Sequence, residues 1–283
     1  MIRVGDALAQ GTKAIQTNQV SKTPLLDASL LLSRITGLSR EQLYAKSDVA
    51  LSDEAVSQYH LLVSRRCEAV PIAYLTGSRE FYGRDFRVTP DVLIPRPDTE
   101  ILVEVALSFL QGKQNPEVLD LCTGSGCVGV SLGAERSDAR ITLADISANA
   151  LEVARSNAQE LLDDQPIIVQ SDLFSELKGK RYTLIASNPP YLTESWYDGT
   201  EPHVKVEPEL ALLGGEEDGL AIIRRIVSEA PEHLQDGGAL VVECDYRQVE
   251  TVMLLLTERG FTEVGSESDL AQLERVVRGI WHV

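Results

Sequence analysis

Residues that hold metal ions or form disulfides are scarce in this chain of 283 residues. Its four histidines are scattered without the spacing of a metal site, and no two of its four cysteines form a C-x-x-C pair. We therefore expect no metal ion, and we expect reduced thiols. The sequence also has no signal-peptide core and no run of about 18 apolar residues. These absences argue against a secreted or membrane-bound protein and favour a cytoplasmic one.

Positive charge is also in short supply, because 26 lysines and arginines stand against 43 acidic residues, for a net charge of −17. Sequence-independent binding to nucleic acid depends on Lys and Arg side chains that displace counterions from phosphates. We therefore expect no direct contact with nucleic acid. The acidity either serves solubility or favours a basic protein partner, and composition does not separate these two interpretations.

The segment Asn188-Pro189-Pro190-Tyr191 follows an apolar run and has the chemistry of a pocket for a planar NH2 group. Proline lacks a backbone N–H, so Pro189 and Pro190 form a stiff turn that offers carbonyl acceptors without competing donors. Asn188 adds a side-chain carbonyl, and Tyr191 adds a flat face. The pattern indicates modification of an amide or exocyclic amine nitrogen. The alternative is a plain turn, for which Asn and Pro are common.

A second motif lies upstream, where the apolar run 117–122 leads directly into a glycine-rich turn and a helical stretch. Gly124, Gly126 and Gly129 fit the spacing G-x-G-x-x-G, which lets a ligand approach the backbone at a helix N-terminus. The next expected strand ends in Asp145 about 20 residues later, the spacing of an acid that binds ribose hydroxyls. Together these features predict a nucleoside cofactor.

The charge beside this turn favours one class of cofactor. A dinucleotide needs an anchor for its pyrophosphate, which Asp120 would repel. S-adenosylmethionine carries a sulfonium cation and no phosphate, so it suits the acid better. Asp120 has an alternative role as a brace for the turn, and Asp172 either lies near the adenine or caps the next turn.

Short apolar runs alternate with helical segments such as 147–162, which predicts an open, mostly parallel, doubly wound α/β sheet. The expected strands are 117–122, 140–145, 167–170 and 182–187. Ligands of such sheets bind outside the carboxyl ends of the strands. We therefore expect Gly124, Asp145, Asp172 and Asn188 around one crevice.

Three segments of the chain match the motifs of one family. They are Leu93-Ile94-Pro95-Arg96-Pro97-Asp98-Thr99-Glu100, Leu119-Asp120-Leu121-Cys122-Thr123-Gly124-Ser125-Gly126 and Asn188-Pro189-Pro190-Tyr191. Together they resemble the bacterial release factor glutamine methyltransferases, also called PrmC or HemK, over nearly the whole chain. Asn-Pro-Pro-Tyr alone is shared with amino-methyltransferases of adenine or cytosine, and the first segment narrows the resemblance to this family.

The resemblance implies a Rossmann-like class I methyltransferase that uses S-adenosylmethionine and leaves S-adenosylhomocysteine. Its implied substrate is the side-chain amide nitrogen of the glutamine in the Gly-Gly-Gln motif of class I peptide chain release factors. The implied cofactor residues are Asp120, Cys122, Thr123, Gly124, Ser125, Gly126, Asp145, Asp172, Leu173 and Asn188. The implied catalytic residues are Asn188, Pro189, Pro190 and Tyr191, which also hold the substrate glutamine together with Arg96 and Glu100.

Arg96 and Glu100 have a plainer alternative, since a proline-flanked arginine before Asp-Thr-Glu also fits a helix cap with a surface arginine. The chain departs from the family at three places. Cys122 stands where the family usually has glycine, Leu173 replaces an aromatic residue near the adenine, and Cys244-Asp245 follows Glu243 where glycine is common. The first two departures put the geometry of the cofactor contacts in question, and none touches the amide pocket.

The part of the chain before the sheet has helical patterning, for example at 24–35 and at 52–66, where Ser52 is a good N-cap. We expect a helical domain at residues 1–75 that docks the substrate, a β-hairpin linker at 76–96 and a methyltransferase domain at 97–283. The helical domain has an alternative role as a stabiliser of the methyltransferase domain. We expect the chain to act as a monomer.

Two rival functions stay open from the sequence. An adenine amino-methyltransferase acting on DNA or RNA calls for a basic target-recognition region, which this composition does not provide. A non-catalytic nucleoside-sensing adaptor would bind the cofactor and form no product. Transfer to an amide requires mainly positioning, because no base has to remove a proton before the methyl group moves.

Overall fold

The structure is a computed structural model that describes residues 1–269 and 271–283. The chain divides into two compact units. The N-terminal unit contains Met1–Ser78 and Glu201–Val206, and the C-terminal unit contains Arg79–Thr200 and Glu207–Val283. Each unit has a hydrophobic core of its own.

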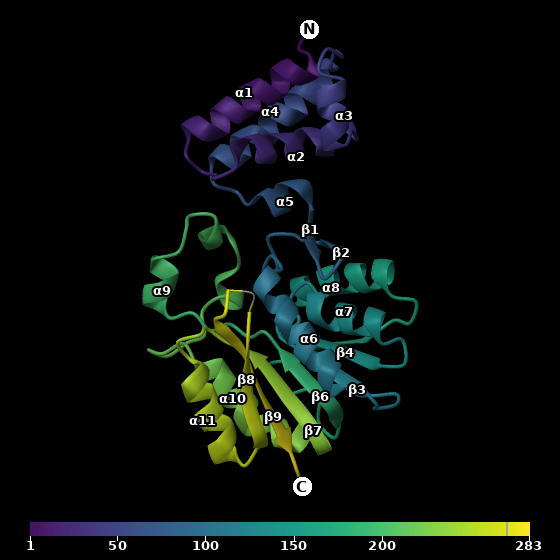
Figure 1. The fold of residues 1–283 in the computed structure, drawn as a ribbon, viewed down its shortest axis with the longest axis vertical. Coiled ribbons are helices and arrows are strands. Elements are labelled where there is room, and N and C mark those ends of the chain that lie inside the picture. The colour runs from purple at the N-terminus through teal and green to yellow at the C-terminus, as the bar shows by residue number, and fades with distance from the viewer. Residues whose placement is uncertain (270) are drawn as a thin grey trace. The chain divides into compact units, whose positions relative to one another are not determined.

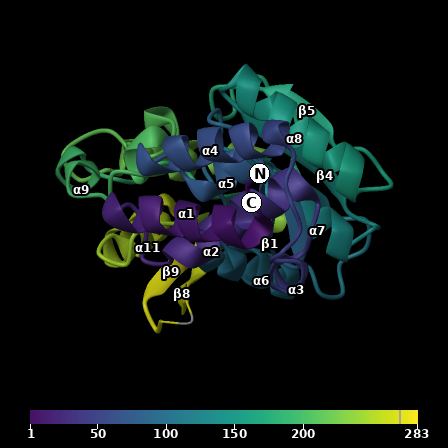
Figure 2. The same ribbon diagram turned by 90° about the horizontal axis from the view of Figure 1, so that it is seen from above.

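The N-terminal unit is helical. Its helices are α1 (Val4–Thr17), α2 (Pro24–Thr36), α3 (Arg40–Ala45), α4 (Asp53–Cys67) and α5 (Ile72–Thr76), with the short 3-10 helix η2 (Val204–Val206). Helices α1, α2 and α4 pack side by side (Figures 1 and 2). Ser52 caps α4 by accepting a hydrogen bond from the backbone N–H of Ala55, as its sequence predicts. A buried ion pair joins Arg66 of α4 to Asp27 of α2 at 2.7 Å.

The C-terminal unit is built on a sheet of seven strands in the order β5-β4-β3-β6-β7-β9-β8. The strands are β3 (Glu117–Leu121), β4 (Arg140–Asp145), β5 (Ile167–Gln170), β6 (Tyr182–Ser187), β7 (Leu234–Glu243), β8 (Thr262–Ser268) and β9 (Glu274–Trp281). Strands β3 to β7 are parallel, and β9 pairs antiparallel with both β7 and β8.

Helices cover both faces of this sheet. They are α6 (Glu100–Phe109), α7 (Cys127–Glu135) and α8 (Ala148–Leu161) on one face, and α10 (Ala221–His233) and α11 (Val249–Arg259) on the other (Figure 1). Successive strand residues point to opposite faces, so Val118 of β3 packs in the core under α6 and α7, whereas Leu119 packs in the core with α10. The doubly wound α/β sheet predicted from the apolar runs is thereby confirmed.

Shorter elements complete the chain. They are the two-stranded sheet of β1 (Ser78–Phe81) and β2 (Arg84–Arg87), helix α9 (Glu194–Asp198), and the 3-10 helices η1 (Pro97–Thr99) and η3 (Glu209–Ala211). Among the helices of residues 1–269 and 271–283, none is long and apolar enough to cross a bilayer.

Candidate active site

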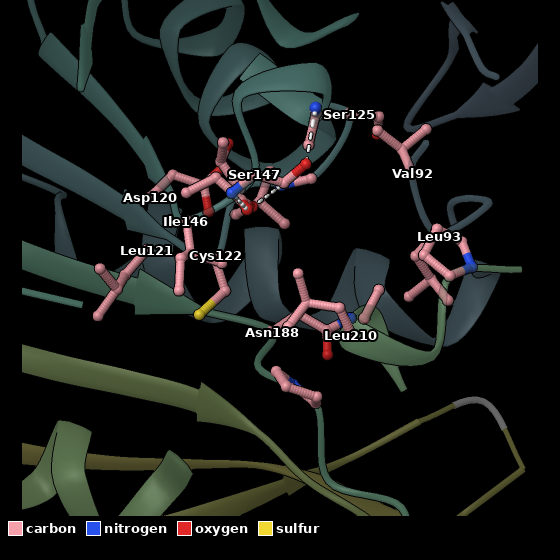
Figure 3. Close-up of a pocket in the computed structure, with 18 of the residues that line it drawn as sticks. Val92, Leu93, Asp120, Leu121, Cys122, Ser125, Ile146, Ser147, Asn188 and Leu210 are labelled. Atoms are coloured by element: carbon pink, nitrogen blue, oxygen red, sulfur yellow. Dashed lines mark hydrogen bonds between the residues drawn. The ribbon is translucent and has the colours of Figure 1, made fainter. Parts of the chain in front are cut away.

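A cavity lies at the carboxyl ends of β3, β4, β5 and β6, where the sheet order reverses between β3 and β6. It contains about 1270 Å³ of empty space, part of it open to solvent, which is enough for a nucleoside-sized ligand. Figure 3 shows Asp120, Leu121 and Cys122 on one side of the cavity and Val92 and Leu93 on the other. The predicted site residues that line it are Arg96, Asp120, Cys122, Thr123, Gly124, Ser125, Asp145, Asp172, Leu173, Asn188 and Pro190.

The three glycines after β3 serve three different purposes. Gly124 has a φ of +53° and faces open space, since a Cβ there would meet no atom of the described residues within 4 Å. Gly126 has a φ of +82° and forms the N-cap of α7. Gly129 has a helical backbone, but a Cβ on it would lie 2.3 Å from Leu143 Cδ2. The turn therefore opens the backbone to a ligand, and α7 packs closely on the sheet.

Asp120 braces this turn from inside. Its Oδ2 accepts hydrogen bonds from the Thr123 hydroxyl at 2.6 Å and from the Gly129 backbone N–H at 2.8 Å. Burial raises the pKa of the Asp120 carboxyl to about 7, against the opposing effect of both hydrogen bonds. The bracing role is thus visible in the structure, and the side chain also lines the cavity.

Asp145 ends β4 and connects two segments of the cavity wall. Its Oδ2 accepts from the Gly124 N–H at 2.8 Å, and its Oδ1 accepts from the Ser147 N–H at 2.9 Å. Burial raises the pKa of this carboxyl, and the backbone hydrogen bonds oppose the rise. Each carboxylate oxygen can accept a second hydrogen bond, so Asp145 can still bind hydroxyl groups in the cavity.

Asp172 and Leu173 follow β5 and meet the cavity in different ways. Asp172 is about half exposed and pairs with Arg225 of α10 at 3.0 Å. Leu173 is buried in the core cluster that includes α10 and has a φ of +48°. It therefore offers the cavity an apolar contact, from a backbone conformation that a leucine adopts only under constraint.

Cys122 has a φ of +59° at the start of the turn. A residue with a Cβ pays a steric penalty in this region, which explains why glycine is usual at such a position. Burial raises the pKa of the thiol well above its usual range, and a hydrogen bond with Ser187 opposes the rise. The thiol is therefore neutral at physiological pH and not activated as a nucleophile.

Asn188 follows β6 and lies between the two walls of the cavity (Figure 3). Its Nδ2 donates to the Thr99 hydroxyl at 3.0 Å. Because the NH2 end of the side chain is held in this way, Oδ1 is the end that can accept a hydrogen bond from a ligand. Pro190 also lines the cavity, whereas Pro189 is buried beside it.

Tyr191 does not form the flat wall of the cavity that the sequence predicts. In the part of the chain that the structure describes, it is not a lining residue, and its hydroxyl donates to Glu243 Oε1 at 3.4 Å. Its backbone carbonyl accepts from Gln248 Nε2 at 2.9 Å, and a Cβ on Gly219 would lie 2.3 Å from the same carbonyl oxygen. Burial raises the pKa of the Tyr191 hydroxyl. The tyrosine thus anchors the turn to β7 and α11.

Arg96 and Glu100 come from the same motif but lie in different surroundings. Arg96 lines the cavity, and its guanidinium lies 2.5 Å from Oε1 of Glu207, whose other oxygen accepts from the Ile94 N–H at 2.9 Å. Glu100 is not a lining residue in the described chain, and its carboxylate accepts from the Tyr82 N–H at 2.9 Å. Glu100 therefore braces the segment after β1.

Several proteins that share one name are similar to this chain over most of its length. It is 44% identical over 272 residues to "Release factor glutamine methyltransferase" of Burkholderia pseudomallei, an alignment that covers 94% of this chain and 95% of the relative. The protein of the same name from Escherichia coli is 38% identical over 270 residues, with 95% and 97% covered. The chain belongs to the release factor glutamine methyltransferase family.

Two family models match separate parts of the chain. The PrmC N-terminal domain matches residues 6–77, and the methyltransferase small domain matches residues 98–200. The crystal structure of a methyltransferase from Pyrococcus furiosus aligns with a TM-score of 0.51 at 14% identity, covering 80% of this chain and all of that one. At this identity the likeness concerns the fold alone. The predicted resemblance of the chain to the family is confirmed.

Several residues of the site were missed by sequence reasoning. Thr99 lies within the segment 93–100 that matches the family, so this motif held a signal for it. Glu243 ends an apolar strand with an acid, the same pattern that identified Asp145. Gln248 and Arg225 carry no comparable signal. Within residues 1–269 and 271–283, no group of three or more His, Cys, Asp or Glu side chains is arranged to hold a metal ion.

Proposed function

We propose that this chain transfers a methyl group from S-adenosylmethionine to the side-chain amide nitrogen of the glutamine in the Gly-Gly-Gln motif of class I release factors. One observation carries the proposal. The acceptor turn that begins at Asn188 and the glycine turn that begins after β3 line the same cavity. The names of the relatives give the substrate class.

The lining residues fit the cofactor. Gly124 leaves the backbone open, Asp145 has acceptor capacity for ribose hydroxyls, and Asp172 offers a carboxylate for an exocyclic amine. Both arginines of the lining, Arg96 and Arg225, are paired with carboxylates, so the wall keeps little charge for a pyrophosphate. S-adenosylmethionine supplies an electrophilic methyl group on a sulfonium. Leu173 contributes an apolar contact to the same wall.

The acceptor turn orients the substrate amide. Asn188 Oδ1 accepts one N–H of the glutamine NH2 and a backbone carbonyl of the proline turn accepts the other, while the prolines add no competing donor. These acceptors raise the electron density on nitrogen and fix its direction. Such positioning lowers the barrier of a two-component reaction by roughly 7–11 kcal/mol. Positive charge that develops on nitrogen is stabilised by the carbonyl dipoles.

Recognition of the whole release factor involves more than the cavity. In this proposal the N-terminal unit docks the release factor, and the enzyme acts in the cytoplasm as a monomer. The net charge of −17 favours a partner with basic surface over a nucleic acid.

The proposal is tested by incubating the full chain with labelled S-adenosylmethionine and, in parallel, with a class I release factor, with DNA and with RNA. Label in the release factor, mapped by mass spectrometry to the glutamine of Gly-Gly-Gln, is the expected result. A matched release factor with that glutamine replaced by glutamate must stay unlabelled. Label in nucleic acid alone would establish the amino-methyltransferase instead, and cofactor binding without any product would establish the adaptor.

A further inference from the structure

The acceptor turn can form few backbone hydrogen bonds of its own. Pro189 and Pro190 have no backbone N–H, and their rings fix φ, so ψ is the one soft backbone angle that each proline keeps. The directions of the proline carbonyls therefore depend on how the two ends of the turn are held. The first end is held by β6, which leads into Asn188, and by the hydrogen bond from Asn188 Nδ2 to Thr99. The second end is the peptide group of Tyr191.

Gln248 holds this second end. It lies directly before α11 and is 4% exposed. Its Nε2 donates to the Tyr191 carbonyl at 2.9 Å and to the Asp218 carbonyl at 2.8 Å, and its Oε1 accepts from the Asp245 N–H at 3.1 Å. Both N–H groups and the oxygen of this amide are thus engaged, which fixes its orientation. Loss of the amide would remove a donor from the Tyr191 carbonyl, and such a loss is costly in the interior.

The loop at residues 214–219 lies against the same peptide group. A Cβ on Gly219 would lie 2.3 Å from the Tyr191 carbonyl oxygen, and a Cβ on Gly214 would lie 2.8 Å from Tyr191 Cα. The Gly214 N–H also donates to the Leu192 carbonyl at 3.0 Å. Because glycine has no side chain, the loop can approach the turn this closely, and the Gln248 amide joins the two segments.

We propose that Gln248 is a positioning residue that sets the direction of the proline carbonyls by fixing the Tyr191 peptide group, an inference that rests on the function proposed above. In that function a carbonyl of the proline turn accepts the second N–H of the substrate amide. A turned carbonyl misaligns the amide nitrogen with the methyl group, and a displacement of about 1 Å costs on the order of a hundredfold in rate.

The cofactor side of the cavity does not depend on Gln248. The proposed cofactor contacts at Gly124, Asp145 and Asp172 lie on the segments that follow β3, β4 and β5. A change at Gln248 therefore lowers the rate of methyl transfer and leaves the affinity for the cofactor nearly unchanged. A mutation that only loosened the fold would not separate these two quantities.

The first test replaces the amide of Gln248. Gln248→Met keeps an unbranched chain and removes both donors, whereas Gln248→Glu keeps the length and turns a carboxylate towards two carbonyl oxygens. We expect kcat on the release factor to fall roughly tenfold to a hundredfold in Gln248→Met and at least as far in Gln248→Glu. The affinity for S-adenosylmethionine, measured by calorimetry, should stay within about threefold of wild type. Circular dichroism identifies a temperature at which each variant is folded.

Arg224→Met is the matched control for this test. Arg224 pairs with Glu216 and Asp218 of the same loop, and its removal leaves the hydrogen bonds of Gln248 in place. Exposed ion pairs contribute little to stability, so we expect this variant to keep kcat within about twofold of wild type.

The second test displaces the Tyr191 carbonyl from the side of the loop. Gly219 and Gly215 both have a φ of +73°, so an alanine at either position is strained in the same way. A Cβ on Gly219 meets the Tyr191 carbonyl oxygen, whereas a Cβ on Gly215 has Ala221 Cβ at 3.3 Å as its nearest neighbour. We expect kcat to fall at least about tenfold in Gly219→Ala and to stay within about threefold of wild type in Gly215→Ala.

Three results would overturn the inference. They are a folded Gln248→Met or Gln248→Glu enzyme with the kcat of wild type, a loss of cofactor affinity as large as the loss of kcat, and equal kcat in Gly219→Ala and Gly215→Ala. The glycine pair decides the question if neither Gln248 variant folds. A wild-type enzyme that binds the cofactor and leaves the glutamine unmethylated would instead refute the proposed function, so the two failures are distinguishable.

Discussion

The two turns that face each other across the cavity are supported in different ways. The glycine turn is braced by Asp120, whose hydrogen bonds reach residues 3 and 9 positions away in the chain. The acceptor turn is held by Thr99, Glu243 and Gln248, which lie 89, 52 and 57 positions from the residues they bind. Both turns bind a buried carboxylate. Asp120 belongs to the same segment as the glycine turn, whereas Glu243 is far in sequence from the acceptor turn.

The two turns therefore differ in what their geometry depends on. A turn that carries its own brace keeps its geometry whenever the strand and helix around it form. A turn held by distant residues keeps its geometry only when β7, α11 and η1 are all in place. We expect the acceptor turn to respond to substitutions far from it in sequence, and the glycine turn to respond mainly to substitutions within it.

The largest effect is expected from Asn188→Ala. The variant loses the acceptor that directs the substrate amide, so methyl transfer should fall by roughly a hundredfold to a thousandfold. The affinity for S-adenosylmethionine, measured by calorimetry, should change only modestly. Equal turnover in the variant would remove the acceptor turn from the mechanism, and a matching collapse of cofactor affinity would show that the two turns are not separable.

A second prediction concerns the two buried carboxylates. Burial raises the pKa of Asp120 and of Glu243 to about 7, above their values in an unfolded chain. The folded state therefore binds more protons between about pH 4 and pH 7, and the free energy of unfolding should fall as pH rises through this window, by on the order of a few kcal/mol.

Denaturant unfolding at several pH values checks this trend. Asp120→Asn and Glu243→Gln each remove one of the two groups, so each variant should show a shallower decrease than wild type. If both variants retain the wild-type dependence of the free energy of unfolding on pH, other carboxyl groups cause that dependence.

A third prediction concerns the packing of the glycine turn. Gly129→Ala places a Cβ 2.3 Å from Leu143 Cδ2 and 2.8 Å from Asp120 Cβ, so the helix must shift away from the sheet. We expect the free energy of unfolding to fall by about 1–3 kcal/mol and cofactor binding to weaken. Gly133→Ala on the same helix is the control, because its nearest neighbour is 3.1 Å away and its loss should be smaller. Equal losses would show that the close approach at Gly129 is unimportant.

The smallest effect is expected at Cys122, where the φ of +59° strains any residue with a Cβ. Cys122→Gly and Cys122→Ala both remove the thiol, and only the glycine relieves the strain. We expect Cys122→Gly to be more stable than Cys122→Ala by about 0.5–1 kcal/mol, as thermal or denaturant unfolding will show. The reverse order would indicate that the surrounding structure relaxes around the Cβ.

The strands around the cavity could be predicted to within one residue. The run expected at 140–145 is strand β4 (Arg140–Asp145), and the helix expected at 147–162 is α8 (Ala148–Leu161) with Ser147 as its N-cap. Such precision is possible because a buried parallel strand is a short apolar run that ends at turn residues. The antiparallel pair β8 and β9 was not predicted.

Contacts between distant segments were much harder to predict. Nothing in the sequence pairs Thr99 with Asn188 or Gln248 with Tyr191, because each pair is brought together by the order of the strands. Glu100 illustrates the same difficulty, since the motif that suggested a substrate contact does not reveal that its carboxylate accepts from the Tyr82 N–H.

The sequence by itself determined the alternation of strands and helices, the glycine turn with its internal acid and the proline turn that offers carbonyls. These depend on periodicity and on backbone properties of single residues, which are local. The tertiary structure alone decided which way the Asn188 amide points. That orientation depends on the Thr99 hydroxyl ahead of α6, which lies 89 positions from Asn188 in the chain and becomes its neighbour only when the sheet has assembled.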